Sequence, residues 1–158
     1  MNELFLLTDG SVNVETRVGY GAYLLVHAEE LFNATLKSKV KTKCFENTSS
    51  TKLELQTLLW ALSELQESSK KLIIYTDSQN IAGLPGRRKR VEKNNYFTKK
   101  NELIANHELY KTFFQCIDFF ESEIVKVKGH QPGKNKNEIE RFFTLVDRAS
   151  RNALRKGN

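Results

Sequence analysis

The chain has 158 residues, of which 39% are hydrophobic and 28% charged, a balance typical of one soluble globular domain that needs no staples to bury its core. No apolar run approaches the roughly 20 residues that span a bilayer, and the first residues lack the basic start of a secretory signal. We therefore expect a cytoplasmic protein with reduced cysteines. The formal net charge of +6 favours a negatively charged partner.

The N-terminal third predicts three strands. Leu4–Thr8 is a short apolar run that ends at Asp9-Gly10-Ser11. Tyr20–His27 and Leu31–Cys44 alternate between apolar and polar residues and are joined by the turn Ala28-Glu29-Glu30, so they are expected to pair antiparallel. The third of these strands is expected to expose a row of lysines, namely Lys37, Lys39, Lys41 and Lys43.

A helix and a central strand are predicted next. Thr48-Ser49-Ser50-Thr51 is typical of a helix start, and leucines recur at helical spacing from Leu55 to Leu65. Leu72–Tyr75 is a run of apolar and aromatic residues, as in a strand covered on both faces, and it ends at Thr76-Asp77-Ser78. Because a helix separates them, this strand is expected to lie parallel to an earlier one.

The second half predicts two helices and one strand. Gly83-Leu84-Pro85-Gly86 is expected to break the chain. Asn101–Phe120 has the pattern of an amphipathic helix, and Glu123–Lys128 alternates as a strand with one wet face. A polar loop from Gly129 to Glu138 follows, and Thr144 is expected to cap a last helix.

One basic segment accounts for the whole net charge. Tyr96 and Phe97 lie within it, and basic side chains interleaved with aromatic ones are typical of nucleic-acid contacts. A solvated charged loop is the alternative interpretation. The segment contains one acid, Glu92, and seven basic residues: Arg87, Arg88, Lys89, Arg90, Lys93, Lys99 and Lys100.

Four acids stand near the ends of predicted elements. Each has an ordinary structural explanation as a turn, a cap or a favourable charge at a helix start. Together, however, such carboxylates repel one another and cannot bind a phosphate, whereas Mg²⁺ accepts both carboxylate and phosphate oxygens. Two ions about 4 Å apart can activate water and stabilise a leaving oxygen in phosphodiester cleavage. These acids are Asp9, Glu54, Asp77 and Asp147.

Five short motifs carry a resemblance to a known family. They are Asp9-Gly10-Ser11, Leu53-Glu54-Leu55, Thr76-Asp77-Ser78-Gln79, Val127-Lys128-Gly129-His130 and Val146-Asp147-Arg148. In this order and spacing the chain resembles ribonuclease H of the bacterial type, from Leu4 to Arg155. The resemblance implies an α/β, ribonuclease H-like fold with a mixed five-stranded sheet flanked by helices. Strands 1–3 would be antiparallel and strands 4–5 parallel, in a single domain over 1–158 with a basic insertion at about 84–100.

The same resemblance implies an activity and the residues that perform it. The activity is metal-dependent endonucleolytic cutting of the RNA strand of RNA/DNA hybrids, with two Mg²⁺ ions (Mn²⁺ as an alternative), leaving 3′-hydroxyl and 5′-phosphate ends. His130, on a Gly-flanked loop, would move a proton or help the product leave. The implied metal ligands are Asp9, Glu54, Asp77 and Asp147. The expected substrate-binding residues are Ser11, Ser50, Thr51, Gln79, Arg87, Arg88, Lys89 and Arg90. We expect a monomer without an obligate protein partner.

Two departures from the family pattern bear on substrate choice. Val12–Arg17 replaces a Gly-, Asn- and Pro-rich stretch, and Ser49-Ser50-Thr51 stands where the family often has asparagines that contact 2′-hydroxyls. Two other hypotheses therefore stay open. A DNA-directed metal nuclease of the same fold is favoured only by the altered stretch. A non-catalytic nucleic-acid-binding module would be excluded by metal-dependent turnover.

Overall fold

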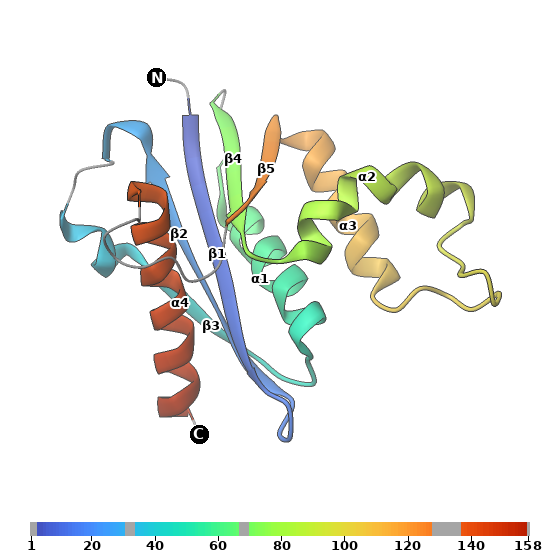
Figure 1. The fold of residues 1–158 in the computed structure, drawn as a ribbon, viewed down its shortest axis with the longest axis horizontal. Helices are drawn as coiled ribbons and strands as arrows, with labels where there is room; N and C mark the ends of the chain where they lie inside the picture. The colour runs from blue at the N-terminus through green and yellow to red at the C-terminus, as the bar shows by residue number, and fades with distance from the viewer. Residues whose placement is uncertain (1–2, 31–33, 67–69, 128–136, 158) are drawn as a thin grey trace.

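Five strands form one mixed sheet in the order β3-β2-β1-β4-β5 in the computed structural model, which describes residues 3–30, 34–66, 70–127 and 137–157 (Figure 1). β1 pairs antiparallel with β2, and β2 with β3, whereas β4 lies parallel to both β1 and β5. The predicted mixed five-stranded α/β fold is thus confirmed. The strands are β1 (Glu3–Asn13), β2 (Val18–His27), β3 (Lys41–Phe45), β4 (Lys71–Thr76) and β5 (Ser122–Lys126).

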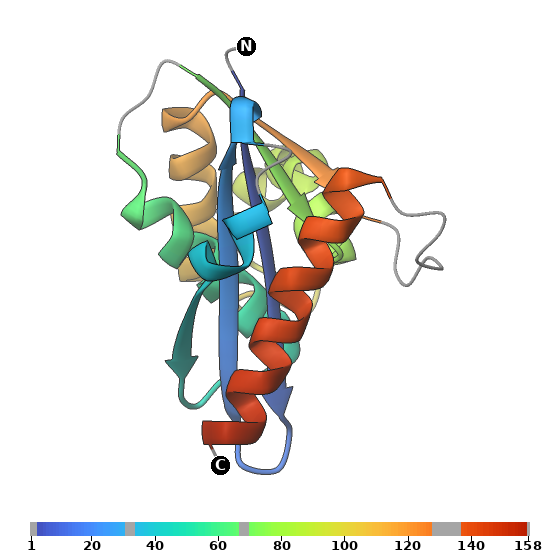
Figure 2. The same ribbon diagram turned by 90° about the vertical axis from the view of Figure 1, so that its left-hand side faces the viewer.

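The helices cover the two faces of the sheet unequally. α4 crosses one face, over β1 and β2, while α1 packs on the other face of the same strands (Figure 2). α3 packs on α1, and α2 leads away from the end of β4 toward α3 (Figure 1). The helices are α1 (Ser50–Glu64), α2 (Gln79–Lys93), α3 (His107–Phe119) and α4 (Glu138–Gly157), with short 3-10 helices η1 (Ala28–Glu30) and η2 (Ala34–Lys39).

The alternation of side chains along β1 divides the hydrophobic core into two halves. Leu4 and Leu6 are buried toward α1 and α3, whereas Phe5 and Leu7 are buried toward α4. Since successive side chains of a strand point to opposite faces, Asp9 continues the α4-facing row. No helix in the described ranges is long and apolar enough to cross a membrane, and neither cysteine of the chain forms a disulfide.

The predicted strand over residues 31–44 is wrong over residues 34–40, and residues 31–33 lie outside the described residues. Residues 34–39 form η2, and of the described residues in this stretch Lys41–Phe45 pair with β2. The reason is Leu36, which is 1% exposed and packs into the core half under α4, so the chain folds over rather than extends. The prediction failed because lysines alternate with other residues here, which is also the pattern of a strand with one exposed face.

The predicted break at Gly83–Gly86 is also wrong, because α2 runs through it with Pro85 inside the helix. Ile81, Leu84 and Val91 are buried at helical spacing, and their burial outweighs the poor helix propensity of the intervening residues. Pro85 costs the helix one backbone donor.

The start of the last helix lies six residues before the predicted cap. α4 begins at Glu138, and the hydroxyl of Thr144 donates to the Glu140 carbonyl at 3.0 Å, one turn back inside the helix. The buried residues Phe142, Val146 and Ser150 form a continuous stripe at every fourth position. By contrast, α3 begins later than predicted, at His107, because Asn101 and Asn106 have left-handed φ values of 63° and 65°.

Candidate active site

The two central parallel strands bring Asp9 and Asp77 side by side. Leu7 of β1 and Tyr75 of β4 are the last paired positions of this ladder, and each acid lies two residues further along the chain. β1 does not end at Asp9 as predicted. It continues to Asn13, with Asp9 opposite Ala22 of β2. Asp77 follows the last residue of β4, and the next residue, Ser78, rather than Asp77 caps α2.

Glu54 is directed to the same place by the first helix. Thr51 and Glu54 have the spacing of a capping box, in which the Glu54 side chain would accept from the Thr51 backbone N–H. That box is not formed, because Ser49 is the N-cap of α1 and its side chain accepts from Lys52 N at 3.3 Å. Instead, the Glu54 carboxylate accepts a hydrogen bond from Ser78. Glu54 therefore lies beside the residue that follows Asp77.

Asp147 reaches the cluster from the other face of the sheet. It lies in the middle of α4, not in its first turn as predicted, on the side that packs against β1. Its carboxyl interacts with that of Asp9, and this interaction contributes to the raised pKa of Asp9. Arg151, one turn further along, contacts Asp147 at 3.0 Å between Nε and Oδ1.

The electrostatics of the cluster show an excess of negative charge. Burial and the neighbouring charge of Asp77 raise the pKa of Asp9 to about 8. Burial also raises the pKa of Glu54, and the charge of Asp77 adds to this, whereas the hydrogen bond from Ser78 lowers it. A bound cation would relieve both effects.

The donor set therefore suits a divalent cation. Carboxylate oxygens are the ligands that Mg²⁺ and Mn²⁺ prefer. Within the part of the chain that the structure describes, no three Asp, Glu, His or Cys side chains are arranged as a finished metal site. The acids lie near one another and repel, so a cation would have to draw them into its coordination shell.

An open pocket of about 420 Å³ gives access to Asp9, Glu54 and Asp77, whereas Asp147 is not part of its lining. Of the predicted substrate-binding residues, Ser11 and Ser50 line it, while Thr51 and Gln79 are exposed outside its lining. His130 lies outside the described residues. The pocket is lined by Asp9, Gly10, Ser11, Val12, Ser50, Leu53, Glu54, Asp77 and Leu154.

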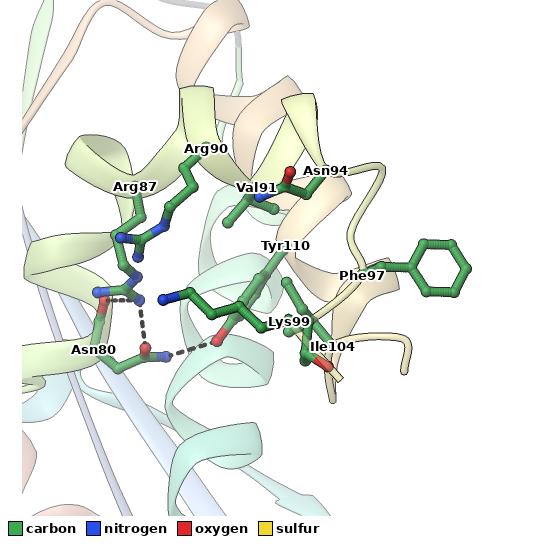
Figure 3. A pocket seen from close by; sticks show the side chains of 10 residues that line it. Asn80, Arg87, Arg90, Val91, Asn94, Phe97, Lys99, Ile104 and Tyr110 are labelled. Carbon is green, nitrogen blue, oxygen red and sulfur yellow. Dashed lines mark hydrogen bonds between the residues drawn. The ribbon is translucent and has the colours of Figure 1, made fainter. Parts of the chain in front are cut away.

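A second, basic pocket of about 550 Å³ opens beside α2. Figure 3 shows the side chains of Arg87, Arg90 and Lys99 directed into the same space. Arg87 is oriented by Asn80, whose side-chain oxygen it contacts at 2.7 Å, and Asn80 in turn donates to Tyr110 at 3.4 Å. No acidic side chain is among the described residues that line this pocket.

Sequence reasoning selected Arg87 and Arg90 but missed the residues that complete this pocket. Lys99 belongs to the recognised basic run, and Asn80 directly follows Gln79, yet neither position carries a motif that distinguishes it from its neighbours. Tyr110 lies on α3, so only the packing of α3 reveals its part.

Arg88 has a different environment from its neighbours. Its guanidinium donates to both carboxylate oxygens of Asp118, at 2.6 and 2.8 Å, and to Glu92 at 3.2 Å, and it lies over the ring of Phe114. This bidentate pair connects α2 to α3 and neutralises Arg88. Lys89 is exposed and is not part of the basic pocket's lining.

Comparison with known proteins shows which family the sequence matches. A family model described as RNase H matches residues 1–153. A protein named Ribonuclease H from Syntrophomonas wolfei is 26% identical and covers 98% of both chains. Another, from Caldicellulosiruptor saccharolyticus, is 26% identical over 82% of this chain and 86% of its own.

Solved structures share the fold at low sequence identity. The solution structure of the PFV RNase H domain has a TM-score of 0.73 and 17% identity, and covers 94% of this chain and 92% of that one. A foamy viral protease-reverse transcriptase in complex with an RNA/DNA hybrid has a TM-score of 0.70 and 10% identity, and covers 95% of this chain and 19% of that one.

Proposed function

The chain belongs to the ribonuclease H family and is an enzyme of that family, and on this basis we propose that it is a metal-dependent endonuclease that cuts the RNA strand of RNA/DNA hybrids. The products would carry 3′-hydroxyl and 5′-phosphate ends. We further propose that it acts in the cytoplasm as a monomer, as one domain over residues 1–158.

The observation that carries the proposal is the convergence of four acids from four separate elements. Asp9 of β1, Glu54 of α1 and Asp77 after β4 line one pocket, and Asp147 of α4 interacts with Asp9 from the other face of the sheet. A buried carboxyl with a pKa of about 8 has no evident structural benefit, but it is expected where a cation completes the charge balance.

We propose that these four acids hold two Mg²⁺ ions, with Mn²⁺ as a substitute. When bound, the metal would activate a water molecule and stabilise the leaving oxygen. The protein's own residues hold the ligands: Ser78 fixes Glu54, and the sheet fixes the spacing of Asp9 and Asp77. Asp147 would exchange its contact with Arg151 for the metal. His130 is proposed to move a proton near the leaving group.

We propose that the substrate lies across both pockets. Ser11 and Ser50, with Thr51 and Gln79 beside them, would contact the strand at the carboxylates. Three convergent cations without a lining acid repel one another and so favour a phosphate, which Arg can bind through two parallel hydrogen bonds. Arg87 and Arg90, together with Lys99, would therefore hold the backbone. Lys89 would add long-range attraction, and Arg88 mainly positions α2.

The test is cleavage of a labelled RNA/DNA hybrid beside matched double-stranded DNA and double-stranded RNA, each with Mg²⁺, Mn²⁺ or chelator. We expect metal-dependent cutting of the hybrid's RNA strand alone. Asp77→Asn should lose at least 100-fold in rate, on the order expected when a metal ligand or preorganised charge is removed.

Other outcomes would identify another function. Metal-dependent cutting of DNA would contradict the hybrid preference and favour a DNA-directed nuclease. Binding without any turnover would leave a nucleic-acid-binding module. Unchanged activity of Asp77→Asn would show that the carboxylate cluster is not the catalytic site.

A further inference from the structure

Ser150 is a buried polar residue that the proposed chemistry does not use. It is 0% exposed and belongs to the stripe by which α4 packs on the sheet. Its hydroxyl donates to the Asp147 carbonyl at 3.0 Å, and its oxygen lies 3.2 Å from the Ser11 hydroxyl. It therefore connects the helix that carries Asp147 to the strand that carries Asp9.

The direction of the bond between the two serines follows from counting hydrogens. A serine hydroxyl has one hydrogen, and a backbone carbonyl can only accept. Ser150 can therefore make both of its hydrogen bonds at once only if it donates to the Asp147 carbonyl and Ser11 donates to Ser150. The remaining lone pairs of Ser11 can only accept, so Ser11 offers the open pocket an acceptor and no donor.

The position of Ser11 makes this direction relevant to substrate choice. Ser11 lies two residues after Asp9 on the same face of β1, and both line the pocket beside Asp77. A phosphate oxygen is itself an acceptor, so an acceptor-only Ser11 cannot bind it. A ribose 2′-hydroxyl can donate, whereas deoxyribose has no hydroxyl there.

We propose that Ser150 fixes Ser11 as an acceptor that selects one ribose of the substrate through its 2′-hydroxyl. Ser11 is then a specificity-determining residue and Ser150 a positioning residue for it. The inference rests on the proposed function and supplies it with a source of RNA selectivity that the altered Val12–Arg17 stretch does not provide. Ser50, which lines the same pocket, has no such hydrogen-bonded partner among the interactions the structure shows and can both donate and accept.

The experiment uses hybrids in which one ribonucleotide at a time carries 2′-fluorine, which removes the donor but keeps a ribose-like sugar pucker. For the wild type, one position near the cut should lose about tenfold in kcat/KM, the size of a single hydrogen bond. In Ser11→Ala the same position should lose nothing further. In Ser150→Ala the loss should shrink at that position alone, because Ser11 can then turn its hydrogen outward.

Thermal unfolding checks that both variants fold, and Ser50→Ala is the matched control, which should keep the full loss at the Ser11 position. Should Ser150→Ala fail to fold, the Ser11→Ala series decides by itself. An equal fluorine penalty at every position in wild type and Ser11→Ala overturns the inference while leaving the proposed function intact. If the wild type does not cut the unmodified hybrid, the proposed function itself is overturned.

Discussion

Asp9 is a buried carboxyl whose negative charge the protein alone leaves unbalanced. Its pKa rises from 3.8 to about 8, chiefly because of burial and secondly because of Asp77. The folded protein therefore keeps a proton that the unfolded chain has already released between these pH values. Without a metal ion, the free energy of unfolding should fall as pH rises from about 4 through about 8.

Asp9→Asn should abolish this decline in the metal-free protein. The amide has no proton to lose, so at pH 8 the variant should be more stable than the wild type, on the order of 1 kcal/mol. Urea unfolding at pH 5, 6.5 and 8 in the presence of EDTA measures the difference. Parallel pH profiles for the two proteins would contradict the raised pKa of Asp9.

Asp118 provides a control of opposite sign. The hydrogen bonds from Arg88 lower its pKa, so the stability they give is present above the ordinary pKa of the unfolded side chain and is lost as pH falls. Asp118→Asn should therefore lower the free energy of unfolding at neutral pH and change it little in acid.

At the residue scale, the sequence selected four candidate acids, Asp9, Glu54, Asp77 and Asp147, but not the contacts that hold them. Their spacing on the chain cannot show that Ser78 bonds Glu54 or that Asp147 pairs with Arg151. These contacts depend on how α1 and α4 dock, and docking is decided by long-range packing. Ser150 was missed for the same reason, since a serine in a helix has no distinguishing pattern.

α2 shows how packing overrides local propensity at the scale of an element. Its sequence contains Gly83, Pro85 and Gly86, yet it is continuous because its apolar residues are buried. Gly86 is exposed, has no left-handed φ, and an added methyl group would meet no atom within 4 Å. The residue thus adds only backbone freedom to the unfolded chain.

Gly86→Ala should raise the free energy of unfolding by about 0.5–1 kcal/mol through the higher helix propensity of alanine. Chemical denaturation measures the gain. Gly21→Ala is the contrasting control, since its methyl would clash with Thr57 Oγ1 and should destabilise by about 2 kcal/mol or more. A loss of stability in Gly86→Ala would mean that α2 is broken there, as its sequence first indicated.

The two faces of α2 should differ in their effect on hybrid binding. Arg87→Ala with Arg90→Ala removes two cations from the basic pocket, and Lys89→Ala with Lys93→Ala removes two from outside its lining. In EDTA, the arginine variant should weaken binding by about tenfold or more and reduce the salt slope by about two. The lysine variant should do so much less, and equal effects would contradict a built phosphate site.

The sheet joins two core halves into one structure at the scale of the whole molecule. β1 contributes Leu6 to the half under α1 and Leu7 to the half under α4, so neither half can open without the other. The fold class was predictable because tight turns, a helix between strands and a run of apolar residues all constrain topology locally. The place where α4 begins was not, because only burial of the stripe through Val146 shows it.

Unfolding should therefore be a single cooperative transition. Trp60, the only tryptophan, packs edge-to-face on Tyr23 on the α1 side of the sheet and reports on that half. Its fluorescence should follow the same melting curve as far-UV circular dichroism. Leu7→Ala, a core change on the α4 side, should destabilise by about 2–5 kcal/mol and shift both curves together. A shift in only one curve would show that the two core halves unfold as separate units.

Asp147 also has a consequence for the order of events during synthesis. Three of the four acids lie within the first 77 residues, and Asp147 follows 70 residues later. At about 5–20 residues per second, a ribosome needs several seconds to add that stretch. Until α4 emerges, Phe5 and Leu7 lack their cover, and Asp9 lacks its partner on the helix. Under the proposed function, the nascent chain would therefore gain activity only once α4 has been synthesised and has packed on β1 and β2.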